Sequence, residues 1–323
     1  MKRIAVLTSG GDAPGMNAAI RAVVRAGVDR GFEVLGVRDG YRGLVDGEMF
    51  LLGRRDVSGI IQLGGTMLGS ARLPTFRDKA VRATAIERLK EAGAGALVVI
   101  GGNGSQTGAA ALWHDGLSVV GVASTIDNDL AGSDPSIGVN TALDVALEAI
   151  DRLKTTAASH KRAFLVETMG RDCGYLALVA GIAGGAEAVV IPEFETSPEA
   201  VAAQLKAAYG RGKSHALVVV AEGAKQNADS LAAYFAEKEP EVGFGLRVTK
   251  LGYVQRGGVP CAFDRLLGTR LGAAAVDVLA RGEAGKLVGL VRSEIVATPY
   301  DDVVGTPKPI DPALFGLAKV MAE

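Results

Sequence analysis

The sequence of 323 residues has few of the features that mark membrane, secreted or nucleic-acid-binding proteins. Its two cysteines, Cys173 and Cys261, are too few for a disulfide framework and too distant from each other for a zinc motif. No apolar run approaches the roughly 20 residues that span a bilayer. Lys plus Arg (35) nearly balance Asp plus Glu (36), so the formal charge of -1 gives no general attraction to nucleic acid. We therefore expect a cytoplasmic protein without disulfides, in which any anion site is local.

Glycine and apolar residues are abundant instead. Hydrophobic residues make up 48% of the chain, which is enough to fill two cores and argues against disorder. The 44 glycines far outnumber the 11 prolines, a composition typical of tight loops between regular elements. We therefore expect the functional residues to lie on glycine loops.

Short apolar runs alternate with segments of helical periodicity. Strands are predicted at 3–8, 32–38, 97–100, 117–123, 162–167, 188–191, 216–221 and 247–254. Helices are predicted at 17–25, 81–92, 107–113, 143–154, 198–208, 229–238 and 265–279. We expect the helix at 229–238 to be exposed. Apolar strands separated by helices indicate parallel sheets covered on both faces. The sequence thus predicts two doubly wound α/β domains with mainly parallel sheets, one at 1–138 plus 256–303 and the other at 139–255 plus 304–323.

The first glycine loop, residues 8–17 (TSGGDAPGMN), joins a predicted strand to a predicted helix. Gly10, Gly11 and Gly15 leave backbone N–H groups exposed at the positive end of that helix, where a phosphate can bind. The loop matches neither the P-loop nor the dinucleotide-binding pattern, and a structural turn without a ligand is the alternative. A second loop, GGNGS at 101–105, repeats the paired glycines after a strand. We expect both loops to line one crevice at the carboxyl ends of the strands.

Asp127 and Asp129 flank Asn128 directly after a predicted strand. In an extended conformation both carboxylates would face the same side, so that one could hold a metal ion while the other takes a proton. Phosphoryl transfer needs both groups. The alternative is an Asp/Asn-rich turn with a capping role.

Arginines recur in several loops, often beside glycine: Arg72, Arg77, Arg162, Arg171 and Arg256. A guanidinium in such a loop suits bidentate phosphate recognition, although any single arginine is more often a surface charge. In a chain of near-zero net charge, the set favours a substrate with more than one phosphate.

Together these segments closely resemble the bacterial ATP-dependent 6-phosphofructokinase family, collinearly over nearly the whole chain. The matching motifs are 8–17, 40–44 (GYRGL), 69–72 (GSAR), 101–105, 125–129 (TIDND), 169–171 (MGR), 221–223 (AEG) and 255–258 (QRGG). The resemblance implies the phosphofructokinase fold and the glycolytic transfer of the γ-phosphoryl of ATP to the 1-hydroxyl of fructose 6-phosphate, with Mg²⁺.

The resemblance also implies residue roles. Asp127 would accept the hydroxyl proton, with Thr125 beside it and Arg72 and Arg171 stabilising charge on the transferring phosphoryl. Asp129 would act through Mg²⁺, and Asn103 stands at the other implied metal position. The implied ATP contacts are Gly11, Tyr41, Arg72, Leu73, Arg77, Gly102, Asn103, Gly104 and Ser105. The implied sugar-phosphate contacts are Thr125, Asp127, Arg162, Met169, Gly170, Arg171, Glu222, Arg247, Tyr253 and Arg256.

Regulation and assembly follow from the same resemblance. Arg162 and Arg247 would reach in from a neighbouring subunit, which implies a homotetramer. An effector site for ADP or phosphoenolpyruvate would use Arg21, Arg25, Arg54, Lys154, Gly185, Glu187, Arg211, Lys213 and His215.

Several positions depart from the family pattern. Asn103 replaces an aspartate and is a neutral, weaker Mg²⁺ ligand. Tyr253 replaces a sugar-phosphate-binding histidine, and Leu73 replaces an adenine-side aromatic. Ser124 stands where ATP users commonly have glycine and pyrophosphate users lysine, while Gly104 agrees with ATP use. Two alternatives therefore stay open: a catalytically impaired binding subunit that regulates an active partner, and a pyrophosphate-dependent enzyme.

Overall fold

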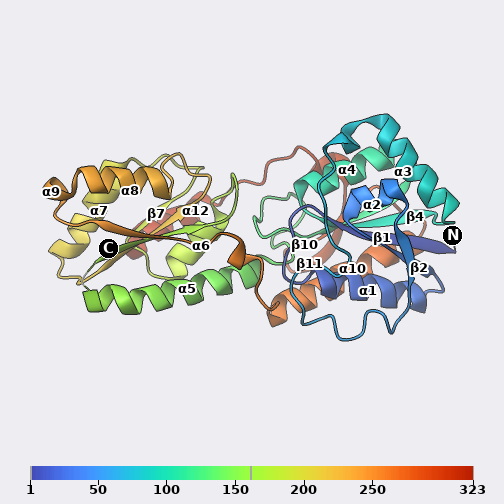
Figure 1. Cartoon of the computed structure of the whole chain (residues 1–323), viewed down its shortest axis with the longest axis horizontal. Coiled ribbons are helices and arrows are strands. Elements are labelled where there is room, and N and C mark those ends of the chain that lie inside the picture. Colours follow the sequence, from blue (N-terminus) through green and yellow to red (C-terminus); the bar gives the residue numbers. More distant parts are fainter. Residues whose placement is uncertain (1, 161, 323) are drawn as a thin grey trace. The chain divides into compact units, whose positions relative to one another are not determined.

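The computed structural model describes residues 2–160 and 162–322, which divide into two compact units (Figure 1). The first unit comprises Met1–Thr141 and Arg256–Lys308, and the second comprises Ala142–Gln255 and Pro309–Glu323. The sequence placed the divisions after residues 138, 255 and 303, and the structure places them after 141, 255 and 308. Among the described helices, none has the length and apolar character needed to cross a membrane.

The first unit is built on a seven-stranded sheet in the order β11-β10-β5-β4-β1-β2-β3. Its strands are β1 (Arg3–Ser9), β2 (Glu33–Val37), β3 (Met49–Leu52), β4 (Ala96–Gly101), β5 (Ser118–Ala123), β10 (Lys286–Val291) and β11 (Glu294–Pro299). The five central strands are parallel, whereas β3 and β11 pair antiparallel at the two edges. All of β4 is buried, as expected for a strand covered on both faces. The prediction of a mainly parallel α/β fold is confirmed.

Helices cover both faces of this sheet. They are α1 (Met16–Asp29), α2 (Gly40–Asp46), α3 (Lys79–Glu91), α4 (Asn103–His114), α10 (Ala262–Ala280) and α11 (Tyr300–Val303), with a 3-10 turn η1 (Pro74–Arg77). Figure 1 shows α1 and α10 on one face and α2, α3 and α4 on the other. Glycines let α1 and α10 approach closely, because a Cβ on Gly272 would lie 2.5 Å from the Ala19 carbonyl oxygen.

The second unit has a four-stranded parallel sheet in the order β7-β8-β6-β9. Its strands are β6 (Ala163–Thr168), β7 (Ala188–Val190), β8 (Ala216–Ala221) and β9 (Leu246–Lys250). Its helices are α5 (Val139–His160), which begins in the first unit, α6 (Tyr175–Ala183), α7 (Pro198–Gly210), α8 (Ala228–Glu237), α9 (Glu239–Val242) and α12 (Pro312–Ala322), with a 3-10 turn η2 (Gly252–Gln255). In Figure 1, α7 and α8 cover one face of this sheet, and α5 and α6 cover the other.

Two expectations for the second unit are wrong. The helix expected to be exposed, α8, is amphipathic and buries Leu231 and Phe235 completely against the sheet. The strand predicted at 247–254 ends at Lys250, because Gly252 adopts a positive φ of 55° and the chain turns into η2.

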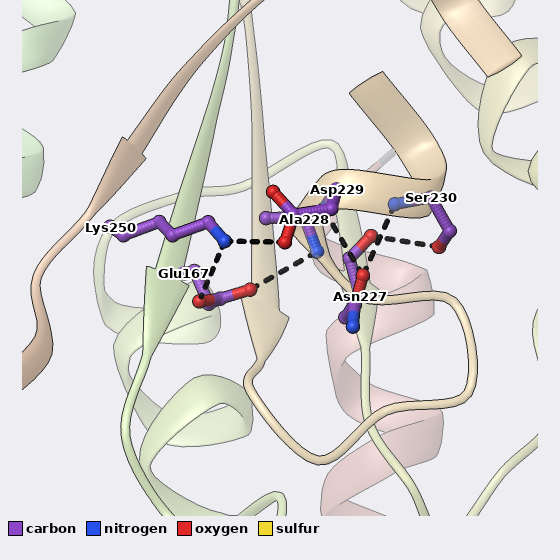
Figure 2. Close-up of polar contacts among 6 residues, drawn as sticks. All are labelled: Glu167, Asn227, Ala228, Asp229, Ser230 and Lys250. Atoms are coloured by element: carbon purple, nitrogen blue, oxygen red, sulfur yellow. Dashed lines mark hydrogen bonds and ion pairs between the residues drawn. The ribbon is translucent and has the colours of Figure 1, made fainter. Parts of the chain in front are cut away.

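Polar contacts fix the start of α8 on the sheet (Figure 2). Asn227 Oδ1 accepts hydrogen bonds of 3.1 Å from the backbone N–H groups of Asp229 and Ser230, and Glu167 Oε2 accepts one of 3.1 Å from Ala228 N. Lys250 Nζ lies 2.7 Å from Asp229 Oδ2 and 3.9 Å from Glu167 Oε1. The side chains of Glu167 and Lys250 thus attach α8 to β6 and β9, which pair with each other in the sheet.

A buried carboxylate anchors the first turn of α5. Asp264, on α10, is fully buried and accepts hydrogen bonds from Gly138 N (2.9 Å), Thr141 N (2.7 Å) and Thr141 Oγ1 (2.6 Å). It therefore satisfies backbone donors that the start of a helix leaves unpaired. Burial raises the pKa of Asp264 from its ordinary value, and these hydrogen bonds oppose that shift.

Asp264→Asn is expected to lower the free energy of unfolding by about 1–3 kcal/mol at neutral pH, because an amide nitrogen would face a backbone N–H group. A carboxyl whose pKa in the folded state is raised above 3.8 contributes most stability below pH 3.8, and this contribution is lost as the pH rises through the raised pKa. The stability advantage of the wild type over the variant should therefore grow as the pH falls towards the pKa of Asp264. Urea unfolding at several pH values measures it.

Asp302→Asn, at an exposed position of α11, is the control and should change stability little at any of these pH values. An advantage of the wild type that shrinks on acidification would contradict the role assigned to Asp264.

Candidate active site

The two glycine turns lie at the switch point of the seven-stranded sheet. In the order β3-β2-β1-β4-β5, strands β2 and β3 lie on one side of β1, whereas β4 and β5, which follow them in the chain, lie on the other side. Open α/β sheets bind ligands outside the carboxyl ends of the strands at such a switch point. Gly10 and Gly11 follow β1, and Gly102 follows β4. The expectation that both turns line one crevice at the carboxyl ends of the strands is therefore consistent with the topology.

The turns are in close contact. Ser9 pairs with Gly101, and a Cβ on Gly101 would lie 2.5 Å from Ser9 O and 2.6 Å from Ser105 Oγ. A Cβ on Gly10 would lie 3.0 Å from the same hydroxyl oxygen. Ser105 thus packs between the two turns, and side chains larger than glycine at residue 101 would push them apart.

The segment 66–70 is attached to the first turn. Ser70 Oγ donates to Gly10 O (2.6 Å), and Thr8 Oγ1 donates to Gly69 O (2.8 Å). Asn17 Oδ1 accepts from Met67 N (2.8 Å), so this side chain holds the neighbouring segment and does not cap its own helix. These bonds bring Arg72, which is exposed, into the neighbourhood of the glycine turn.

Tyr41 supports the first residues of α4, which follow the second glycine turn. It is 5% exposed, stacks on Phe76 with ring centroids 4.0 Å apart, and donates its hydroxyl to Ser105 O at 2.5 Å. Burial raises the pKa of its phenol far above the ordinary value, so the hydroxyl stays protonated. The hydrogen of this hydroxyl is therefore engaged by the Ser105 carbonyl oxygen.

The second turn is shorter than the sequence suggested. The predicted loop 101–105 ends at Gly102, because α4 begins at Asn103 rather than at residue 107. Asn103, Gly104 and Ser105 therefore form the first turn of the helix, where backbone N–H groups favour anions. A Cβ on Gly104 would meet nothing within 4 Å, so this glycine is not required by packing inside the protein.

The Asp127 loop is not extended, and the expectation that residues 127 and 129 face one side as in a strand is wrong. Ile126 and Asp127 form a bend, and Asn128 takes a left-handed conformation with a φ of 55°. Asp127 is 5% exposed, and its backbone N–H donates to Thr125 Oγ1 (3.2 Å). A Cβ on Gly102 would lie 3.0 Å from Thr125 Cβ, so this loop starts beside the second glycine turn.

Asp129 has the properties of a magnesium ligand. Its Oδ1 is buried and has no hydrogen-bond partner among the described residues. A carboxylate oxygen is the kind of ligand that Mg²⁺ prefers, and one or two such groups suffice where substrate phosphates and waters complete the shell. Asn103 lies beside it, because Asn103 Nδ2 donates to Asp129 O (3.1 Å). The residues present therefore fit a Mg²⁺ ion, with Asn103 contributing at most a neutral oxygen.

The second unit gathers another set of the predicted residues at the carboxyl ends of its strands. Glu222 Oε1 accepts hydrogen bonds from Gly170 N (3.3 Å) and Arg171 N (2.9 Å), and Gln255 Oε1 accepts one from Met169 N (2.7 Å). Arg171 has a φ of 53°, a left-handed conformation that these bonds stabilise. The side chain of Arg171 is exposed.

Arg162 and Arg247 lie at the other end of this sheet. Arg162 precedes β6 whereas Met169 follows it, and Arg247 pairs with Phe164 near the start of β6. At about 3.3 Å per residue, the strand separates Arg162 from Met169 by roughly 20 Å. One copy of the chain thus does not bring the two ends to the same small ligand.

Two further predicted contacts follow β9. Tyr253, in η2, is 78% exposed. Arg256 belongs to the first unit, where a Cβ on Gly11 would lie 2.9 Å from its guanidinium carbon. This arginine is therefore in contact with the first glycine turn.

The predicted effector residues form separate groups in the two units. Arg21 and Arg25 lie four residues apart on α1, and Arg54 Nη2 lies 3.2 Å from Asp29 Oδ1 at the end of that helix. In the second unit, Lys154 Nζ donates to Gly184 O (3.0 Å), which lies next to Gly185 in the chain, and Lys213 Nζ donates to Glu187 Oε1 (2.8 Å). Arg211 Nη2 donates to Ala322 O (3.0 Å), and Ser214 Oγ lies 3.2 Å from His215 Nδ1.

Sequence reasoning missed some side chains that shape these loops. Gln255 stands in a quoted motif, but its contact with Met169 N depends on the neighbouring ends of β6 and β9. Lys308 contacts the loop that follows Asp127, although 180 residues separate it from Asn128. No local signal in the sequence marks such a contact.

Comparisons with known proteins agree with this arrangement. Residues 3–279 match the model of the phosphofructokinase family. The ATP-dependent 6-phosphofructokinase 1 of Thermus thermophilus is 52% identical over 100% of both chains, and the ATP-dependent 6-phosphofructokinase of Clostridium botulinum is 47% identical over 100% of both.

Solved structures give the same result. Phosphofructokinase from Saccharomyces cerevisiae matches with a TM-score of 0.89 and 38% identity over 100% of this chain and 48% of the yeast chain. A pyrophosphate-dependent phosphofructokinase from Marinobacter aquaeolei, 21% identical over 97% of this chain and 86% of its own, shares the fold with a TM-score of 0.87. By its sequence match, its full-length relatives and its fold, the chain belongs to the phosphofructokinase family.

Proposed function

We propose that this protein is an ATP-dependent 6-phosphofructokinase, which transfers the γ-phosphoryl of ATP to the 1-hydroxyl of fructose 6-phosphate in glycolysis. The observation that carries this proposal is the 52% identity, over the full length of both chains, to a relative named for that activity. The glycine turns at the switch point and the neighbouring Asp127 loop supply the groups that phosphoryl transfer needs.

The nucleotide binds at the glycine turns. This assignment is supported by the backbone N–H groups at the start of α1 and α4, which attract phosphate, and by the exposed Arg72 and Arg77. The implied contacts are Gly11, Tyr41, Arg72, Leu73, Arg77, Gly102, Asn103, Gly104 and Ser105. Gly104 agrees with ATP use, and a Cβ there would meet nothing within 4 Å, so the space beside the first turn of α4 is open.

Asp127 accepts the proton of the sugar hydroxyl. Its burial strengthens electrostatic contacts, and its backbone bond to Thr125 orients it. Arg72 and Arg171 stabilise the charge on the transferring phosphoryl. Asp129, with Asn103 beside it, would hold Mg²⁺, which when bound neutralises charge on the phosphate oxygens.

The sugar phosphate is bound by residues of two copies of the chain. Met169, Gly170, Arg171, Glu222, Tyr253 and Arg256 come from one copy. Arg162 and Arg247 come from another, because they lie at the opposite end of the sheet from Met169 and Glu222. A homotetramer satisfies this requirement and also brings the two groups of effector arginines and lysines together for ADP or phosphoenolpyruvate. The cytoplasm is the compartment in which these substrates meet the enzyme.

Asp127→Ala is expected to reduce kcat by about 10²–10⁴-fold, because the general base is lost while the nucleotide turns remain. Fructose 1,6-bisphosphate formation from Mg-ATP and fructose 6-phosphate measures this loss, with pyrophosphate tested in place of ATP. Asp302→Asn, at an exposed position of α11, is the control and should retain activity. A wild type that turns over with pyrophosphate but not with ATP would refute the proposed donor.

The variant Asn103→Asp distinguishes two hypotheses. In one, the protein is a kinase that is active with asparagine at residue 103; in the other, it is a binding subunit whose catalysis this asparagine impairs. Aspartate cannot donate to Asp129 O, so the variant should be less stable without Mg²⁺. It should also reach half-maximal activity at a Mg²⁺ concentration about 3–10-fold lower, because a charged ligand binds the ion more tightly. Kinetics against Mg²⁺ concentration and thermal unfolding with and without Mg²⁺ measure both effects.

Asn103→Ala, which removes both the donor and the oxygen, is the matched control and should lose stability without any gain in Mg²⁺ affinity. If the wild type is silent and Asn103→Asp is active, asparagine impairs catalysis. If both proteins are silent, the result favours a binding role.

Mixing two inactive variants tests the shared sugar site. Asp127→Ala and Arg162→Ala should each be nearly inactive, yet co-refolded mixtures should regain activity. A hybrid pair contains one site with both an intact Asp127 and an intact Arg162. Activity of mixtures against each variant refolded alone measures the effect. No recovery in assemblies that mass spectrometry shows to be mixed would contradict the contribution of Arg162 from a second copy.

A further inference from the structure

The loop that carries Asp127 contains an asparagine in an unusual conformation. Asn128 lies between Asp127 and Asp129, is 3% exposed, and has a φ of 55°. Asparagine tolerates the left-handed region better than most residues, and hydrogen bonds to its side chain can hold it there. Its side-chain oxygen accepts hydrogen bonds from Ser136 N at 3.2 Å and from Lys308 Nζ at 2.9 Å.

Lys308 supplies three hydrogen bonds to this loop. Besides Asn128 Oδ1, its Nζ donates to Ser133 O at 2.7 Å and to Asp134 O at 2.5 Å. An ammonium group has three donors, and these three acceptors all lie within residues 128–134. Lys308 thus joins Asn128 to residues 133–134, which form the returning arm of the same loop.

The returning arm is itself fixed to the sheet. Leu290 N donates to Ser133 Oγ (3.0 Å), Asp134 N donates to Leu290 O (2.7 Å), and Arg292 N donates to Asp134 Oδ2 (2.7 Å). The arm is therefore anchored on β10 and on the turn to β11. Lys308 connects this anchored segment to Asn128, because its ammonium donates to both.

We propose that Lys308 is a positioning residue for phosphoryl transfer, whose ammonium holds Asn128 in its left-handed conformation and thereby directs the Asp127 and Asp129 side chains. This inference rests on the proposed function of the Asp127 loop. Lys308 touches neither substrate nor metal in this role. Its effect is on orientation, and an error of about 1 Å in the placement of reacting groups can reduce a rate by about 10²-fold.

Lys308→Met keeps the length and the apolar stem of the side chain but removes the ammonium. We expect kcat to fall about 10–100-fold, with KM for Mg-ATP and for fructose 6-phosphate changing less than about threefold. Hydrogen exchange of the peptide amides in residues 124–138 should become at least about tenfold faster in the variant without any substrate.

Lys250→Met is the matched control. Lys250 also contacts two acceptors, but these lie in the other unit, Asp229 in the first turn of α8 and Glu167 on β6 (Figure 2). This variant should leave the exchange of residues 124–138 unchanged and kcat within about twofold of wild type.

A chemical rescue separates the ammonium from the rest of the side chain. In Lys308→Cys, the thiolate displaces bromide from 2-bromoethylamine and forms a C–S bond, which restores an ammonium at nearly the length of lysine. Alkylation should recover most of the lost kcat and slow the exchange of residues 124–138. Wild type treated in the same way controls for reaction at Cys173 and Cys261.

The outcomes distinguish this inference from the proposed function. If the wild type forms no fructose 1,6-bisphosphate, the proposed function fails, and faster exchange in Lys308→Met would still show the ammonium holding the loop. If the wild type is active and Lys308→Met keeps its kcat, the positioning role is overturned, whatever the exchange shows. An alkylated Lys308→Cys that stays slow, with its modification verified by mass spectrometry, overturns it as well.

Discussion

The parallel pairing of β1 with β4 is the constraint on which the candidate site of the first unit depends. Ser9 lies opposite Gly101, and a Cβ at residue 101 would lie 2.5 Å from Ser9 O. The two strands can therefore end side by side because the second turn opens with glycine. Helices α1 and α4 begin just beyond these turns, and the positive end of each helix favours an anion. Strand β5 then brings the Asp127 loop beside the second turn.

Several polar side chains at the carboxyl ends of these strands hold loops in place. Asn17 holds Met67, Ser70 holds Gly10, and Asn103 holds the backbone of Asp129. These bonds fix the backbone, so that the turns do not need to be ordered when the substrate arrives. In the second unit, Glu222 plays a comparable part, since one of its oxygens holds the turn at 170–171.

The sequence was sufficient for the elements whose signal is local. The strand at 216–221 was predicted to the residue, because six consecutive apolar residues form a strand buried on both faces. The hairpin of β10 and β11 was not predicted. Its turn has positive φ at Arg292 and Ser293, and neither is the glycine or asparagine that usually marks such a turn. The start of α4 at Asn103 was also missed, since glycine and asparagine are poor helix formers.

The sequence by itself determined the parallel α/β class, the glycine turns and the family resemblance, because hydrophobic periodicity and glycine spacing are properties of neighbouring residues. The tertiary structure alone decided how Asp127 and Asp129 are presented. The left-handed Asn128 depends on Lys308, 180 residues away, and that contact exists only once β10, β11 and the following segment have packed beside β5. Strand direction likewise decided that Arg162 and Met169 lie at opposite ends of one sheet.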